Sequence, residues 1–382
     1  MTNSGSYEIY VHIPFCVRKC NYCDFLSFAA DDEAKESYVK ALIDEIGAYN
    51  GYEGVSAASV YFGGGTPSIL KAQQLRRITK ALRARFNIAS DAEITIEVNP
   101  GTASCDKIEE IADIGFNRVS IGLQSVHDDE LRMLGRIHDY RQFEECYSWI
   151  RDAGFDNVSI DIMTALPGQN AAKLTETLER IIKLRPEHVS AYSLIIEEGT
   201  PFYEKYGDID GPVIGEEEER RLYALTNRLL AEAGYEHYEI SNYARPGYES
   251  RHNCGYWTGV PYIGFGLGAS SFTPISNEYE AIRSKNTSNM ELYIGGKPHD
   301  NSEDVMLTKE ELMSEVCFLG LRMRRGVSYD DFFERFGIPL REVYGSQIDK
   351  LVRDGLLIGT DDNITLSDMG IDYGNYVFSH FI

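Results

Sequence analysis

The sequence predicts an α/β fold, a partial (β/α)6 TIM-like barrel followed by a smaller helical domain. Its 382 residues exceed one ordinary small core and fit a barrel with an appendage. Short β-rich runs alternate with amphipathic segments, which is typical of a parallel sheet. Polar and glycine-rich motifs follow several predicted strands, and parallel barrels carry their chemistry at the C-terminal ends of their strands.

The predicted elements follow one another in a regular order. Six β-rich runs, each separated by a segment with apolar residues near i, i+3 and i+4, are predicted to be strands: Glu8 to Ile13, Ser59 to Phe62, Glu93 to Val98, Arg118 to Gly122, Asn157 to Asp161 and His188 to Leu194. A Gly- and aromatic-rich stretch from Tyr235 to Thr273 follows. A helical region from about Thr308 closes with two short β candidates near Leu356 and Ile364. We divide the chain at 1–240, 241–300 and 301–382.

Composition limits the partners. The formal net charge of −23 disfavours broad contact with nucleic acid or anionic lipid, which requires clustered Lys and Arg. The N-terminus lacks a signal region, and no apolar run approaches the roughly 20 residues that span a bilayer. We therefore expect a soluble protein without a transmembrane segment, with peripheral membrane contact left open. Seven cysteines, three of them clustered, fit a reducing cytoplasm better than a disulfide framework.

Cys16, Cys20 and Cys23 form a CxxxCxxC motif just behind the first predicted strand. Structural zinc sites and ferredoxin-type clusters take four protein ligands. Three thiolates therefore favour a [4Fe-4S] cluster with one iron open to a ligand that is not protein. Cysteines packed as small apolar side chains, or a zinc knuckle, are the alternatives.

Further motifs stand at the ends of the next strands. Gly63 to Gly65 let backbone groups approach a ligand, and Thr66 with Pro67 opens the next helix. Glu97, Gln124 and Asp161 lie at the ends of strands three, four and five. Because parallel strands end at one rim, we expect these residues and the cysteines to share one active site.

These motifs resemble one radical S-adenosylmethionine (SAM) family, the oxygen-independent coproporphyrinogen oxidases (HemN) and their relatives, the heme chaperones called HemW. The resemblance covers nearly the whole chain, and the motifs occur in the family's order: Tyr-Val-His-Ile-Pro-Phe-Cys, Tyr-Phe-Gly-Gly-Gly-Thr-Pro-Ser, Arg-Val-Ser-Ile-Gly-Leu-Gln-Ser, Leu-Gly-Arg-Ile-His and Ala-Leu-Pro-Gly-Gln. It implies that SAM chelates the open iron, and that one electron from the cluster cleaves SAM to a 5′-deoxyadenosyl radical. It also implies that the SAM contacts are Tyr10, Gly64, Gly65, Thr66, Glu97, Gln124, Arg136 and Asp161.

Two differences favour the chaperone branch of this family. The oxidases carry a fourth cysteine two positions after the third, where this chain has Phe25, and they have a long segment ahead of the cluster. The run His252-Asn253-Cys254-Gly255-Tyr256-Trp257 resembles the HNxxYW motif of the chaperones. By that resemblance His252 is an axial ligand of heme iron, and Tyr256 and Trp257 stack on the macrocycle. Cys254 is a competing ligand.

The chain also departs from its relatives at two places. Ser270 stands where a histidine is usual, and Ala165 stands where a glycine is usual before Leu-Pro. The first change puts a second histidine ligand in doubt, and the second puts in doubt the shape of the loop after strand five.

The C-terminal region resembles the family's winged-helix-like appendage. Its acidic residues outnumber its basic ones despite Arg322, Arg324 and Arg325, so we expect covering or partner docking and not DNA binding. Together these features predict a cytoplasmic heme chaperone that passes heme to acceptor proteins and needs an electron donor. The alternative is a coproporphyrinogen III oxidase; a DNA-binding regulator is the remaining class.

Overall fold

A long sheet wrapped by helices forms the main body of the protein in the computed structural model, which describes residues 6–52, 54–209, 211–275, 281–299 and 303–382. Six parallel strands stand side by side in chain order, and each lies in or next to a run that the sequence predicted. They are β1 (Ser6–Ile13), β2 (Ser56–Gly64), β3 (Asn87–Val98), β4 (Arg118–Gln124), β5 (Val158–Thr164) and β6 (His188–Ser193). The predicted α/β barrel is confirmed.

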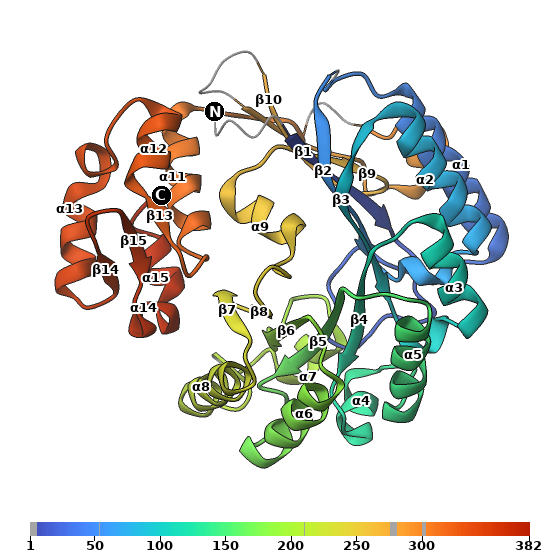
Figure 1. Ribbon diagram of the computed structural model, residues 1–382, viewed down its shortest axis with the longest axis horizontal. Helices are drawn as coiled ribbons and strands as arrows, with labels where there is room; N and C mark the ends of the chain where they lie inside the picture. The colour runs from blue at the N-terminus through green and yellow to red at the C-terminus, as the bar shows by residue number, and fades with distance from the viewer. Residues whose placement is uncertain (1–5, 53, 210, 276–280, 300–302) are drawn as a thin grey trace.

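Helices cover the outer face of these strands and leave the inner face open (Figure 1). Six of the seven residues of β4 are buried, including Arg118, Ser120 and Gln124 on its inner face. The helices of the main body are α1 (Asp32–Ala48), α2 (Ala72–Arg85), α3 (Cys105–Ile114), α4 (Asp128–Leu134), α5 (Tyr140–Asp152), α6 (Ala171–Leu184), α7 (Pro201–Tyr206) and α8 (Glu216–Glu232).

The stretch after α8 extends the same sheet at both of its edges. β7 (Glu236–Glu239) and β8 (Asn242–Ala244) pair beyond β6, while β9 (Tyr262–Phe265) lies parallel to β1 on the other edge. β10 (Ser270–Pro274), β11 (Ala281–Lys285) and β12 (Val305–Leu307) continue from β9 in antiparallel order. The sequence analysis did not predict β9, because its four residues include a glycine and stand in an aromatic-rich stretch without clear alternation.

Between the two edges lies α9 (Arg251–Thr258), which carries the HNxxYW motif. In Figure 1 it stands between the barrel strands and the C-terminal domain. The Ser250 side chain caps its first turn, and Gly259, at φ +69°, ends it in the left-handed conformation that glycine adopts readily. α10 (Met290–Ile294) packs back onto α1.

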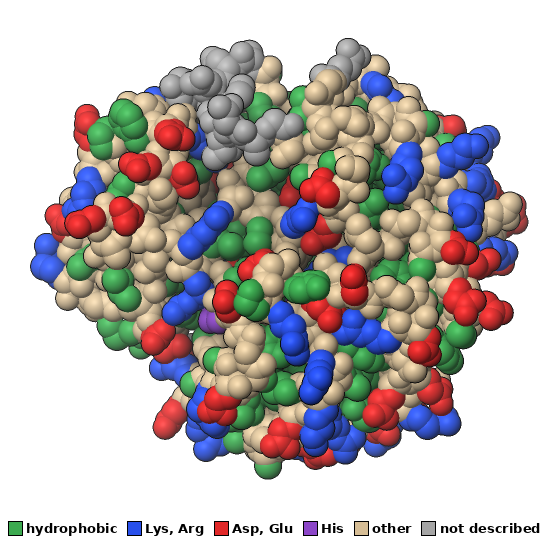
Figure 2. Space-filling view, viewed as in Figure 1, with side chains coloured by type: hydrophobic (Ala, Val, Ile, Leu, Met, Phe, Trp, Pro, Cys, Tyr) green, Lys and Arg blue, Asp and Glu red, His purple; other side chains and the backbone are tan. Residues whose placement is uncertain are grey.

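The C-terminal domain has a second hydrophobic core, which also takes in Phe272 of β10, Ala281 of β11 and Leu307 of β12. Its elements are α11 (Lys309–Gly320), β13 (Val327–Ser328), α12 (Tyr329–Phe336), α13 (Leu340–Arg353), β14 (Leu357–Gly359), β15 (Asn363–Leu366), α14 (Asp368–Asp372) and α15 (Gly374–Phe378). The helices α11, α12 and α13, with a small antiparallel sheet of order β13-β15-β14, match the predicted winged-helix-like arrangement; β13 lies between α11 and α12 in the chain. Charges of both signs are interspersed over this domain in Figure 2.

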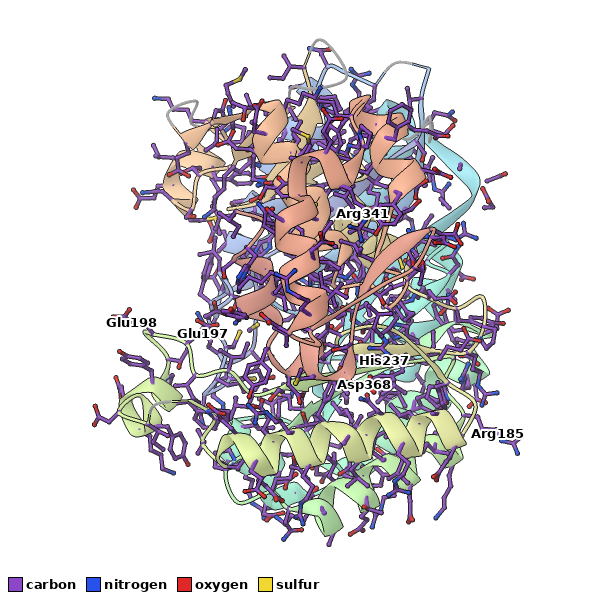
Figure 3. The ribbon with its side chains drawn as sticks, turned by 90° about the vertical axis from the view of Figure 1, so that its left-hand side faces the viewer. Arg185, Glu197, Glu198, His237, Arg341 and Asp368 are labelled. Carbon is purple, nitrogen blue, oxygen red and sulfur yellow. The ribbon has the colours of Figure 1, made fainter. Side chains whose placement is uncertain are left out.

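Backbone contacts join the C-terminal domain to the barrel. Ile240 N donates to Arg322 O at 3.2 Å, and Arg324 N donates to Tyr238 O at 2.9 Å, so the segment after α11 pairs with β7. His237 of β7 and Asp368 of α14 mark this junction in Figure 3. The junction fixes how α11 and α12 stand relative to α9.

Candidate functional site

One cavity of about 400 Å3 opens at the C-terminal ends of the barrel strands. Its walls carry all three cysteines of the motif and most of the polar residues that the sequence singled out. Those lining it are Cys16, Cys20, Cys23, Gly64, Gly65, Thr66, Glu97, Gln124, Arg136 and Asp161. The expectation that these motifs share one site therefore agrees with the geometry.

The cysteines lie on the loop between β1 and α1, and all three are free and half-buried. Cys16 Sγ lies 3.4 Å from Thr66 Oγ1, and Arg136 Nη1 donates to Cys20 Sγ at 3.7 Å. Among the residues with described positions, no three His, Cys, Asp or Glu side chains form a group that could hold a metal ion.

The glycines after β2 allow the backbone to pass directly against the cysteine loop. Gly65 N donates to Ile13 O at 2.9 Å, and a Cβ on Gly65 would come within 2.8 Å of Phe15 O. Gly64 has φ +107°, and a Cβ there would lie 2.3 Å from the His12 ring. Only glycine fits these two positions without displacing the cysteine loop.

Two carboxylates face the cavity from β3 and β5, the strands on either side of β4. Tyr61 Oη donates to Glu97 Oε1 at 2.8 Å, and burial, with the Asp161 carboxylate nearby, raises the pKa of Glu97 to about 7. Asp161 accepts hydrogen bonds from Ser120 at 2.8 Å and Ser159 at 3.1 Å, and burial raises its pKa as well. The site can therefore hold or release a proton near neutral pH at Glu97.

Arg136 enters the cavity from the loop after α4. Its Nη2 donates to Gly122 O at 2.8 Å, and a Cβ on Gly122 would lie 3.0 Å from this nitrogen and from Gln124 Nε2. Tyr10 does not line the cavity; its hydroxyl lies 3.0 Å from His12 Nδ1, and His12 Nε2 lies 2.9 Å from Leu26 O. Through His12, Tyr10 is therefore linked to the cysteine loop.

The sequence analysis missed several residues that line this cavity. All of them are strand residues that face inward. They lie two positions along a strand from a residue that the sequence singled out, or beside such residues on a neighbouring strand: Tyr61, Arg118, Ser120, Ser190 and Tyr192. Arg118, Ser120, Gly122 and Gln124 all lie on the cavity face of β4. The period of two in a strand was the available signal, because alternate residues share a face.

His252 lies behind the cavity and not in it. Its side chain is 2% exposed, Nδ1 lies 2.7 Å from Ser59 Oγ, and Nε2 lies 3.1 Å from Tyr256 Oη. Burial, together with the Arg118 charge, lowers the pKa of His252 to about 3. The ring is therefore neutral, and both of its nitrogens have hydrogen-bond partners. Asn253 of the same helix does line the cavity.

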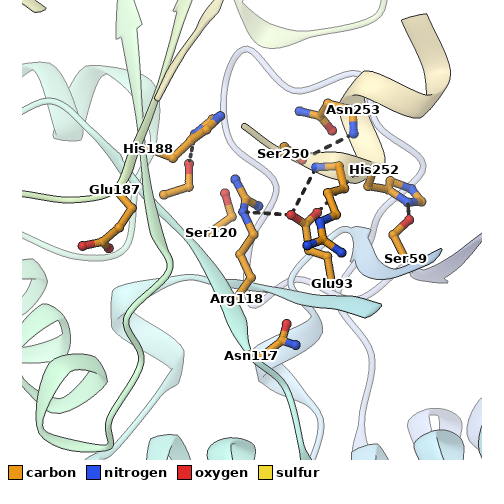
Figure 4. A network of polar contacts seen from close by, with 12 residues as sticks. Ser59, Glu93, Asn117, Arg118, Ser120, Glu187, His188, Ser250, His252 and Asn253 are labelled. Carbon is orange, nitrogen blue, oxygen red and sulfur yellow. Dashed lines mark hydrogen bonds and ion pairs between the residues drawn. The ribbon is translucent and has the colours of Figure 1, made fainter. Parts of the chain in front are cut away.

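A buried polar network holds the start of α9 against the barrel (Figure 4). Glu93 accepts from the backbone N–H of Arg251 at 3.1 Å and of His252 at 3.3 Å, while Arg118 Nε lies 3.9 Å from its carboxylate. A second route runs from Asp161 through Ser159 to His188 Nδ1 at 2.8 Å, and His188 Nε2 lies 2.8 Å from Tyr238 Oη. Ser250 N donates to that hydroxyl at 3.3 Å. The cavity floor and α9 thus share one connected set of hydrogen bonds.

The departures from the family's pattern have visible consequences. Ala165 has φ +58°, a left-handed conformation that glycine adopts at lower cost, which explains the glycine usual there. Ser270 lies on β10, outside the cavity. Phe25 lies at the cavity's edge with its side chain 64% exposed.

Comparisons with known proteins agree with this fold. The model of the Radical SAM superfamily matches residues 10–181, and the HemN C-terminal domain matches residues 307–373. The structure is similar to that of coproporphyrinogen III oxidase (HemN) from Escherichia coli, with a TM-score of 0.83 and 22% identity, covering 100% of this chain and 91% of that one. The fold and the cavity thus define a radical SAM protein.

Relatives narrow the class further. The heme chaperone HemW of Lactococcus lactis is 35% identical over 98% of this chain and 96% of its own length. HemW of Bacillus subtilis is 33% identical and that of Escherichia coli 31%, each over 98% of both chains. The chain belongs to the HemW family, as its motifs predicted. No helix of the described residues is long and apolar enough to cross a membrane.

Proposed function

We propose that the chain is a heme chaperone that binds a [4Fe-4S] cluster, SAM and heme and passes heme to acceptor proteins. Its membership of the HemW family supports the activity. The observation that best supports binding of the cluster and SAM is that one cavity is lined by three free cysteines, by the glycine turn and by seven of the eight expected SAM contacts. A cytoplasmic location and an electron donor belong to the same proposal.

Cys16, Cys20 and Cys23 would hold the cluster, and Gly64, Gly65 and Thr66 would approach SAM through their backbone. The donor set fits, because three half-buried thiols share one wall and the Arg136 guanidinium beside Cys20 can balance thiolate charge. Glu97 and Asp161 would face the positively charged SAM, and Gln124 would complete the wall. When bound, the cluster and SAM would supply one-electron chemistry.

The cluster is tested by iron content after anaerobic reconstitution. We expect about four irons per chain, and slow SAM cleavage after reduction. Cys20→Ala should lose the cluster's absorbance, whereas Cys105→Ser, a half-buried cysteine on α3 outside the cavity, should keep it. Full iron content and an unchanged electron paramagnetic resonance signal in Cys20→Ala would refute the assignment.

For heme we propose His252 as the iron ligand, with Tyr256 and Trp257 beside the macrocycle. Because His252 is buried with both nitrogens engaged, ligation requires the Tyr256 hydroxyl to move off Nε2. His252→Ala should remove the Soret band at micromolar heme while iron content stays unchanged. Tyr256→Phe should bind heme at least as well, since it frees Nε2. If Tyr256→Phe lost heme and His252→Ala did not, the tyrosine oxygen would be the iron ligand. If only Cys254→Ser lost heme, the Cys254 thiolate would be the ligand.

A coproporphyrinogen III oxidase is the alternative, favoured by the similar fold of HemN. Phe25 stands where the oxidases have their additional cysteine, so we expect no conversion of coproporphyrinogen III by the reconstituted protein with SAM and reductant. Protoporphyrinogen detected by mass spectrometry would reverse this ranking. The winged-helix-like domain does not favour nucleic acid, because its acidic residues outnumber its basic ones and both signs of charge occur on the face seen in Figure 2.

A further inference from the structure

Two neighbouring hollows lie between α9 and the C-terminal domain, outside the SAM cavity. Their volumes are about 310 and 250 Å3. Both are lined by Trp257 and Val260 from the barrel side and by Val316 and Arg335 from the C-terminal side. We call this pair of hollows the interdomain cleft.

The walls of the interdomain cleft are mainly apolar and rich in aromatic rings, which favours a flat apolar ligand. The aromatic residues that line it are Tyr256, Trp257, Tyr262, Phe272, Phe318 and Phe332. Trp257 Nε1 is a buried donor without a hydrogen-bond partner among the described residues. A buried donor of this kind costs free energy unless a ligand satisfies it.

Three arginines line the cleft, and two of them, Arg325 and Arg335, have no ion pair among the described residues. Arg283 is paired with Glu315 through two hydrogen bonds of 2.7 and 3.1 Å, so its charge is balanced. For Arg335, by contrast, no ion pair occurs within the described part of the chain. Gly259 leaves room for its guanidinium, because a Cβ there would lie 2.8 Å from Nη1. Burial lowers the pKa of Arg335, which an incoming anion would reverse.

The cleft is held open by the contacts already described. The backbone pairing of β7 with the segment after α11 fixes the two walls, and α9 separates the cleft from the SAM cavity. Asn253 faces the cavity, whereas Tyr256 and Trp257 face the cleft. The His252 that we propose as ligand lies directly behind the Tyr256 hydroxyl.

We propose that the interdomain cleft is the heme site, with the macrocycle between the aromatic walls and one propionate carboxylate on Arg335. The inference rests on the proposed chaperone function and adds the location and the anion partner. Aromatic and aliphatic walls suit a porphyrin face, and an arginine fork suits a carboxylate. An apolar peptide or a second copy of the chain would use the walls but would not require the arginine.

The test uses two porphyrins that differ in whether their propionates are ionised carboxylates or neutral methyl esters. Binding of protoporphyrin IX and of its dimethyl ester to the reconstituted full chain is measured by fluorescence. We expect the diacid to bind about tenfold more tightly than the ester, and Arg335→Gln to abolish that difference while leaving ester binding unchanged. The matched control is Arg341→Gln in the same domain, whose guanidinium is exposed and already paired with Asp349; it should behave like the wild type.

A second variant tests the location without the charge. Val316→Trp places an indole in the wall shared by both hollows and should weaken both porphyrins at least tenfold, with iron content and SAM cleavage retained. Wild-type affinity in Val316→Trp would overturn the cleft as the site while heme binding stands. Equal weakening of both porphyrins by Arg335→Gln would overturn the contact between Arg335 and the propionate. If the wild-type chain binds neither porphyrin nor heme, both the inference and the proposed chaperone function fail.

Discussion

Replacing Glu93 with Gln would test how the barrel holds the helix that carries the HNxxYW motif. The Glu93 side chain is about 5% exposed, accepts two backbone N–H groups at the start of α9 and faces the Arg118 guanidinium, which is 2% exposed. Glutamine keeps the size and one acceptor oxygen but removes the charge. The change therefore isolates the electrostatic part of the contact.

The expected loss follows from these contacts. Hydrogen bonds to a charged group contribute about 1.5–3 kcal/mol each, and removing one partner of a buried ion pair costs about 3–5 kcal/mol. The Asp161 carboxylate also interacts with Arg118 and still balances part of its charge, and glutamine preserves one hydrogen-bond acceptor. We therefore expect Glu93→Gln to lower the free energy of unfolding by about 3 kcal/mol, the lower end of the range for a broken buried ion pair.

Urea unfolding followed by far-ultraviolet circular dichroism measures this loss. Asp91→Asn is the matched control, because Asp91 lies on the same strand and pairs with Arg251 at 3.6 Å, but its side chain is 80% exposed. Exposed pairs contribute about 0–1 kcal/mol, so the control should change little. A Glu93→Gln loss below about 1 kcal/mol, or one equal to the control's, would refute the reasoning.

Three further changes have expected outcomes. Ala165→Gly should stabilise the fold by about 1 kcal/mol in urea unfolding, because it relieves φ +58°, whereas Ala81→Gly within α2 should destabilise it by a similar amount. Gly255→Ala should lower the free energy of unfolding by about 2 kcal/mol or more, because its Cβ would lie 2.2 Å from the buried Glu8 carboxylate. The control is Gly345→Ala, which has no atom nearer than 4.0 Å to its Cβ and should not destabilise α13. Equal effects of the two changes on stability would contradict the packing. The pKa of Glu97 is raised to about 7 in the folded, ligand-free protein, whereas the unfolded chain releases this proton near pH 4.5. The free energy of unfolding therefore falls as the pH rises from about 4.5 to about 7. Urea unfolding at pH 5 and pH 8 should show a fall in the free energy of unfolding that is about 2.5 kcal/mol smaller in Glu97→Gln than in the wild type; equal falls would contradict the shifted pKa.

Much of the fold could be predicted from local patterns. The six barrel strands have β-branched or aromatic runs next to helical periodicity, and their ends coincide with the motifs that line the cavity. β9 could not be predicted, because a four-residue strand with a glycine has too little local signal and is stabilised by pairing with β1 across some 250 residues of chain. Arg118 and Tyr61 were missed although the period of two in a strand could have placed them on the faces that carry the predicted motifs.

By itself the sequence determined the chemistry of the cavity and the family. Cysteine spacing, the glycine turn and the carboxylates at strand ends are local patterns whose positions on a parallel barrel follow from topology. Only the tertiary structure decided the environment of His252. The motif suggested an available imidazole, but packing of α9 on β2 buries the ring between Ser59 and Tyr256 and lowers its pKa. The interdomain cleft and the uncompensated Arg335 also arise only there, because their walls come from segments distant in the chain whose burial no local pattern encodes.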